Sequence, residues 1–174
     1  MTRWVVLVLI LARIVSPSFA ADPLSEAESL LTAQRTRPDA AQFARAKEIA
    51  AVEVKRSPRE PRAWILLAWA QMTEHRFLEA LDAARTAERL APGDARVLAL
   101  AADALVGLGR YDEAVAVTQH LADGAPGTPA WIRAAHLRFL LGDLDGAIEL
   151  ASRAASAGRP RTEATAWTWL DLAR

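Results

Sequence analysis

A pattern that repeats about every 34 residues runs through most of this chain and limits its fold more than any single motif does. The clearest copy covers 61–94 and begins with Trp64 and Leu67 on one helical face. Further copies are expected over about 95–127, 128–163 and 27–60, with a partial copy over 164–174. A repeat of this length predicts a stack of small units, because one unit cannot bury its apolar face alone.

Each copy has the pattern of two helices joined by a short turn. In the clearest copy the apolar positions of the second helix recur at spacings of three and four, as on one helical face. They are Phe77, Ala80, Leu81, Ala84, Ala87 and Leu90. Pro92-Gly93-Asp94 then ends the pair, since proline cannot continue a helix. Among the 39 alanines, those at matching positions let two helix axes pack closely, and we expect an all-α chain.

The spacing resembles that of the tetratricopeptide repeat, in which Trp-x2-Leu-Gly-x2-Tyr is followed by Ala-x3-Phe, Ala and Pro. In the clearest copy the residues in this register are Trp64, Leu67, Ala80, Ala87 and Pro92. In the next copy they are Tyr111, Ala114 and Pro126. The resemblance covers about 27–172. It implies an α-solenoid of stacked antiparallel helix pairs, a right-handed superhelix whose first helices line a concave groove.

Residues 1–20 have the three parts of a secretory signal peptide. A positively charged start is followed by the apolar run Trp4–Ala12, and small residues precede Ala20, after which cleavage is expected. Arg13 interrupts the apolar stretch, so an uncleaved anchor and a misassigned start remain as alternatives. The sequence therefore predicts an exported repeat domain over 21–174, in a bacterial periplasm or secreted. Contact with a membrane is expected only through an uncleaved N-terminal segment.

Composition and motifs argue against catalysis, metal binding and nucleic-acid binding. The 21 basic and 21 acidic side chains cancel, whereas proteins that bind phosphate backbones carry a basic excess. Cysteine is absent, and so are the common phosphate-binding and nucleophile motifs. His75 and His120 are expected at solvated turns or helix ends, and His136 either faces the groove or packs on its helix. We expect no cofactor, no metal and no enzymatic activity.

The resemblance also implies which side chains face the concave groove, namely those of the first helices that do not pack on their own hairpin partner. By matching positions these are Arg62, Ile65, Trp69, Met72, Arg96, Ala99, Asp103, Val106, Ile132, Arg133, His136 and Phe139. Family members that hold an acidic C-terminus use lysine and asparagine there, whereas this chain has no asparagine and two lysines. An apolar groove flanked by arginines suits a hydrophobic segment or an amphipathic helix. The alternative is that Trp69 and Phe139 pack between neighbouring repeats.

The expected function is that of a non-catalytic scaffold that binds a protein or peptide partner in this groove. The alternative is an interaction region of a larger envelope-biogenesis or secretion complex. The last expected helix has no partner helix of its own, and it carries Trp167, Trp169, Leu170 and Leu172. That helix is a cap, a contact with a partner, or part of a longer repeat array of which this chain is a fragment.

Overall fold

The structure is a computed structural model, and it describes residues 22–157. The described residues form eight α-helices and no strand. In chain order the helices are α1 (Pro23–Ala33), α2 (Ala40–Arg56), α3 (Pro61–Thr73), α4 (Phe77–Leu90), α5 (Ala95–Gly107), α6 (Tyr111–Gly124), α7 (Thr128–Leu140) and α8 (Leu144–Ala157). The all-α class predicted from the repeat is confirmed. The expected signal peptide and the partial copy over 164–174 lie outside the described residues.

Acidic side chains fix where three of the first helices begin. Asp22, Glu60 and Asp94 each stand just before a helix, and each accepts a hydrogen bond from the backbone N–H two residues further on. The three distances are 3.1, 3.1 and 2.9 Å. These caps satisfy N–H groups that have no acceptor within the helix, so the chain enters the helix at a defined residue.

Tight turns join the two helices of the last three pairs. The turns consist of residues 74–76, 108–110 and 141–143. In each the middle residue has a positive φ, and these residues are His75 (58°), Gly109 (71°) and Gly142 (85°). Glycine adopts this conformation without a steric penalty, whereas histidine does so less readily. His75 is exposed to solvent at this turn, as expected from the sequence.

The first pair departs from the others in its length. Its first helix begins at Pro23, four residues before the expected start of the copy at 27, because Asp22 provides the cap. Residues 34–39 separate its two helices, so the connection is longer than the three-residue turns. Within residues 22–157, no helix combines the length and the apolar character that crossing a bilayer requires.

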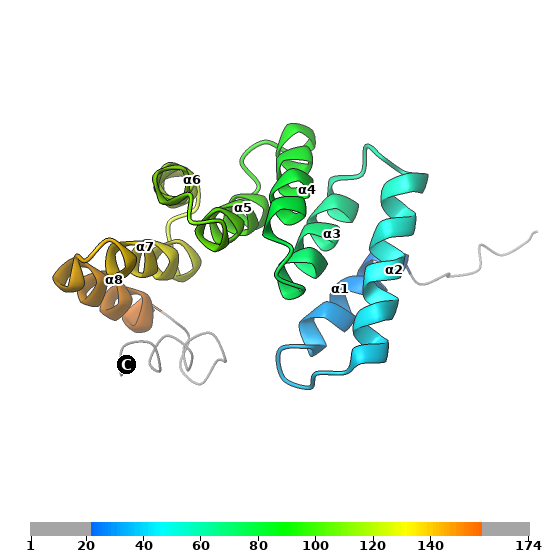
Figure 1. The fold of residues 1–174 in the computed structure, drawn as a ribbon, viewed down its shortest axis with the longest axis horizontal. Helices are drawn as coiled ribbons and strands as arrows, with labels where there is room; N and C mark the ends of the chain where they lie inside the picture. Colours follow the sequence, from blue (N-terminus) through cyan, green and yellow to red (C-terminus); the bar gives the residue numbers. More distant parts are fainter. Residues whose placement is uncertain (1–21, 158–174) are drawn as a thin grey trace, which may run out of the picture.

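The helices stack in the order of the sequence. They pack in adjacent pairs, α1 with α2, α3 with α4, α5 with α6 and α7 with α8, and each pair contacts the next. The first helices also contact one another in order, α1 with α3, α3 with α5 and α5 with α7. Figure 1 shows the pairs following an arc from α1, in blue, to α8, in orange. The first helices of all four pairs therefore build one continuous surface.

Alanine is the commonest residue of the buried core. The largest cluster joins α3, α4 and α5 and extends to Ala114 of α6 and Leu137 of α7. Ala68 of α3 and Ala80 and Ala84 of α4 are at most 1% exposed within it. A second cluster joins α1, α2 and α3, and a third joins α5, α6 and α7. Small side chains at these crossings let the helix axes approach closely, which is the role the sequence predicts for the repeated alanines.

Candidate functional site

A groove of about 550 Å³ runs over the surface built by the first helices. It is lined by residues of α1 or its C-terminal end, of α3, of α5 and of α7. The lining side chains are Glu28, Arg35, Arg62, Ile65, Leu66, Trp69, Met72, Thr73, Arg96, Ala99, Leu100, Asp103 and Arg133. The groove thus lies on the face where the repeat pattern predicts a binding surface.

The structure brings together eight of the residues that the sequence places in the groove. They are Arg62, Ile65, Trp69, Met72, Arg96, Ala99, Asp103 and Arg133. Four others do not line it. Val106 packs against the largest core cluster, Ile132 is half-buried, and His136 and Phe139 are exposed on α7. The groove therefore reaches α7 only through Arg133.

The sixth residue of each first helix lines the groove. These residues are Glu28, Leu66, Leu100 and Arg133. Sequence reasoning selected only Arg133 of this set, although Leu66 and Leu100 occupy the same position in their copies. Glu28 falls into the series only when α1 begins at Pro23. The signal for the two leucines was therefore present in the repeat register, whereas the signal for Glu28 depended on the true start of the first helix.

The floor of the groove is apolar and rests on the core. Ile65 and Leu66 are buried, at 4% and 3% exposure. Trp69 is half-buried and packs against the α1–α2–α3 cluster, while Met72 packs against the α3–α4–α5 cluster. Trp69 thus serves both of the roles considered from the sequence, because it lines the groove and also packs between repeats. Phe139, by contrast, is 58% exposed.

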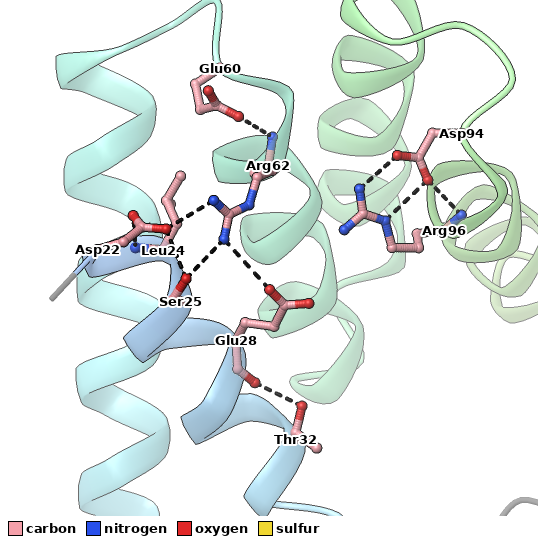
Figure 2. A network of polar contacts seen from close by, with 9 residues as sticks. All are labelled: Asp22, Leu24, Ser25, Glu28, Thr32, Glu60, Arg62, Asp94 and Arg96. Carbon is pink, nitrogen blue, oxygen red and sulfur yellow. Dashed lines mark hydrogen bonds and ion pairs between the residues drawn. The ribbon is translucent and has the colours of Figure 1, made fainter.

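Arg62 ties the first two pairs together at one end of the groove. Its Nη1 donates to Asp22 Oδ2 at 2.9 Å, and its Nη2 donates to Ser25 Oγ at 3.3 Å. The same Nη2 lies 3.7 Å from Glu28 Oε2. Figure 2 shows the guanidinium of Arg62, from α3, surrounded by these groups around α1. The hydrogen bonds from Ser25 and Arg62 lower the pKa of Asp22, so this carboxyl group stays ionised.

Arg133 makes a matching connection at the other end. Its Nε and Nη2 donate to the two carboxylate oxygens of Asp103 at 2.9 and 2.7 Å, and its Nη1 donates to the Pro129 carbonyl oxygen at 2.8 Å. The bidentate geometry is the strong form of an arginine–carboxylate pair. It joins α7 to α5, so both ends of the groove carry an ionic contact between successive first helices.

Arg96 lies between these two ends, and its partner is Asp94, the residue that caps the start of the same helix. Its Nε and Nη2 donate to Asp94 at 3.2 and 2.7 Å. The side-chain hydrogen bond between the two raises the pKa of Arg96 and lowers the pKa of Asp94. Figure 2 shows this pair beside the Arg62 network, on the next first helix. The charged pair is retained at neutral pH.

The histidines lie outside the groove, and the described residues offer no metal site. His75 is in an exposed turn, where its ring meets Phe77 edge to face at 5.6 Å, and His120 is exposed on α6. No group of three or more histidine, aspartate or glutamate side chains in residues 22–157 is placed to hold a metal ion. The chemistry that the groove offers is therefore apolar contact together with hydrogen bonds from arginine.

Comparison with known proteins supports the repeat assignment. The sequence model described as tetratricopeptide repeat matches residues 71–135, which span α4, α5 and α6 together with the end of α3 and the start of α7. This family is typically non-catalytic. No curated protein matches the chain.

Solved structures share the fold at low sequence identity. A thermophilic TPR protein of Thermus thermophilus has a TM-score of 0.71 and 21% identity, over 88% of this chain and 83% of its own. MamA from Desulfovibrio magneticus RS-1 has a TM-score of 0.63 and 17% identity, over 82% and 78%. The Arabidopsis OM64 TPR domain has a TM-score of 0.55 and 18% identity, over 68% and 99%. These likenesses concern the fold.

Proposed function

We propose that this tetratricopeptide repeat protein is a non-catalytic scaffold that binds an apolar or amphipathic segment of a partner protein in the groove. One observation carries the proposal: side chains from all four pairs converge on one groove with an apolar floor of Ile65, Leu66, Trp69, Met72 and Leu100. Apolar grooves built by helices are a common way to hold a peptide or helix. Ionic contacts join successive first helices at both ends of this floor.

We also propose that the scaffold acts outside the cytoplasm of a bacterium, in the periplasm or secreted. The support is the sequence of residues 1–20, with its charged start, apolar run and small residues before Ala20. Expression of the full chain in a bacterium, followed by fractionation and N-terminal sequencing, tests this directly. A protein that stays in the cytoplasm with Met1 intact would contradict it.

The groove is tested by filling it. Ala99 is half-buried on α5, where it lines the groove and also packs against the α5–α6–α7 cluster, and Ala99→Gln places a long neutral side chain over the apolar floor. Peptides of about 16 residues, some four helical turns, are first selected on the wild-type protein from a random-sequence display library. We expect Ala99→Gln to weaken binding of the selected peptides at least about tenfold, because the floor is no longer accessible. Titration calorimetry measures the affinities.

Ala116→Gln is the matched control. Ala116 is exposed on α6, outside the groove, and the substitution adds the same side chain to a helix. Thermal unfolding shows whether both variants keep the wild-type fold. The proposal fails if the library yields no binder, or if the selected peptides bind Ala99→Gln as tightly as they bind Ala116→Gln.

A second candidate function is docking into a larger envelope complex through the α7–α8 end. Four large apolar side chains are more than half exposed there: Phe139 (58%), Leu141 (57%), Leu144 (56%) and Ile148 (58%). Exposed apolar side chains clustered in this way mark contact surfaces. Self-association of the purified chain through this end separates this candidate from the first.

A further inference from the structure

The groove differs along its length in how its first helices are connected. Ion pairs join α1 to α3 through Arg62 and α5 to α7 through Arg133. Among the ion pairs of residues 22–157, none joins α3 to α5. Met72 of α3 and Leu100 of α5 line the groove here and pack against the same core cluster, and Trp69 of α3 lines the groove as well. The two first helices without an ionic connection are therefore joined by apolar contacts.

Arg96 is the arginine at this middle junction that keeps hydrogen-bonding capacity. Its Nε and Nη2 are held by Asp94, as Figure 2 shows, whereas its Nη1 makes no hydrogen bond within residues 22–157. Its side chain is 54% exposed, compared with 36% for Arg62 and 24% for Arg133. Arg62 already donates to Asp22 and Ser25 at α1, and Arg133 donates to Asp103 of α5 and to the Pro129 carbonyl oxygen of its own helix. The Nη1 of Arg96 can donate to a further carboxylate while its Nε and Nη2 stay paired with Asp94.

The carboxylates around the groove are all paired, whereas one arginine edge stays open. Arg62 is paired with Asp22 and lies near Glu28, Arg96 is paired with Asp94, and Arg133 is paired with Asp103, so the charges of these groups largely cancel. A lysine entering the groove would meet carboxylates that already have an arginine partner, whereas a carboxylate would find the Nη1 edge of Arg96.

We propose that the groove binds an amphipathic helix of a partner, with apolar side chains on Trp69, Met72 and Leu100 and one acidic side chain on Arg96. This inference rests on the proposed function and adds the chemistry of the partner to it. A helix is favoured over an extended strand, because the described residues offer no sheet edge to which a strand could add. A side-chain carboxylate is favoured over a chain terminus, because one guanidinium edge offers a single anchor rather than a set of donors that encloses a terminal carboxylate.

The selected peptides test the composition of the ligand. We expect them to be enriched in apolar residues at helical spacing with an aspartate or glutamate beside that stripe, and to gain helical circular dichroism on binding. Replacing the acidic residue by its amide in a synthetic peptide should weaken binding about three- to fivefold, as for a half-exposed ion pair. Amidating the peptide C-terminus should leave binding unchanged.

Variants of the protein test the contact itself. Arg96→Gln should weaken the acidic peptide about three- to fivefold and should bind the amide peptide as wild type does, since the two changes remove the same contact. Arg89→Gln is the matched control, because Arg89 is exposed on α4 outside the groove and loses the same charge. Urea unfolding of both variants confirms that the fold is kept.

The outcomes separate this inference from the proposed function. If groove-dependent peptides are enriched but lack acidic residues, or bind Arg96→Gln as tightly as Arg89→Gln, the inference is wrong and the scaffold function stands. If binding requires the free C-terminal carboxylate of the peptide, the inference is also wrong. If no peptide is enriched, the proposed function falls together with the inference.

Discussion

Asp94 performs two tasks at the start of α5. Its carboxylate accepts the backbone N–H of Arg96 at 2.9 Å, which caps the helix, and it also accepts the guanidinium of the same residue at 2.7 Å. The hydrogen bond from the Arg96 side chain is the largest cause of its lowered pKa. A carboxyl group with a lowered pKa in the folded state stabilises the fold only while it is ionised.

Asp94→Asn separates these two tasks. Asparagine caps helices as well as aspartate does, so the variant loses the charged pair and keeps the cap. We expect it to be less stable than wild type at pH 7, by less than about 1 kcal/mol because solvent screens the pair. The folded pKa lies below the reference value of 3.8, so the wild-type advantage is complete above 3.8 and is lost as the pH falls through the folded value. Urea unfolding from pH 7 down to about pH 2.5 measures how the difference in unfolding free energy between wild type and variant narrows.

Arg96→Gln provides the check on this assignment. Without the guanidinium, the Asp94 carboxyl group loses the main cause of its lowered pKa, so Asp94→Asn made in that background should change the pH dependence much less. A stability difference between Asp94→Asn and wild type that stays constant across the whole pH range would contradict the argument.

At the scale of elements, the ring of Phe77 at the start of α4 lies against the end of α5. A Cβ added to Gly107 would stand 2.6 to 2.8 Å from the Phe77 ring atoms. Gly107→Ala should therefore destabilise the fold by about 1–3 kcal/mol, because this close approach outweighs the gain in helix propensity. Chemical denaturation at pH 7 measures the change in the free energy of unfolding.

Gly124 gives a matched comparison for this prediction. It is the last residue of α6 as Gly107 is of α5, and a Cβ there meets nothing within 4 Å. Gly124→Ala should be neutral or stabilising by up to about 1 kcal/mol. Adding Phe77→Leu to Gly107→Ala should recover part of the loss. If Gly107→Ala and Gly124→Ala change the stability alike, the contact with Phe77 is not what makes a side chain at position 107 unfavourable.

The repeat period predicts the helices well, because apolar spacing and turn residues are local signals. It does not predict the start of α1, since the cap at Asp22 precedes the first recognisable copy. The register also identifies most of the groove, and a stricter use of it would have added Leu66 and Leu100, which share the sixth position with Arg133. Position within a repeat fixes the side of the helix on which a residue lies, but not how far the groove extends along the stack. For this reason the register predicts Phe139 in the groove, whereas the residue lies outside it.

The ionic contacts of the groove were beyond prediction from the sequence. Arg62 and Asp22 are 40 residues apart, and Arg133 and Asp103 are 30 residues apart. Each contact depends on the rotamers of two long side chains across a helix junction, and neither the period nor the charge pattern determines these. Among the described residues, Arg96 forms its ion pair within its own helix start, and this follows from the same geometry.

At the scale of the whole molecule, matching apolar positions are buried in the middle of the stack and exposed at its α7–α8 end. Leu81 of α4 is 1% exposed in the largest core cluster, whereas Ile148, at the matching position of α8, is 58% exposed. No residue of α8 belongs to the three buried clusters of residues 22–157. Leu141 and Leu144, at the last described turn, are 57% and 56% exposed. These exposures are the reason for proposing this end as a docking surface.

If the α7–α8 end is a docking surface, the purified full chain should self-associate through it, because no other partner is available to cover the exposed apolar side chains. Light scattering after size-exclusion chromatography should show a mass that rises above 18.9 kDa with concentration. The double variant Leu144→Glu/Ile148→Glu should return the mass to that of the monomer. Leu78→Glu is the matched control, because Leu78 is 57% exposed on α4, away from this end, and should leave the association unchanged. A wild-type protein that stays monomeric at every concentration would contradict docking through this end and leave the groove as the surface that carries the function.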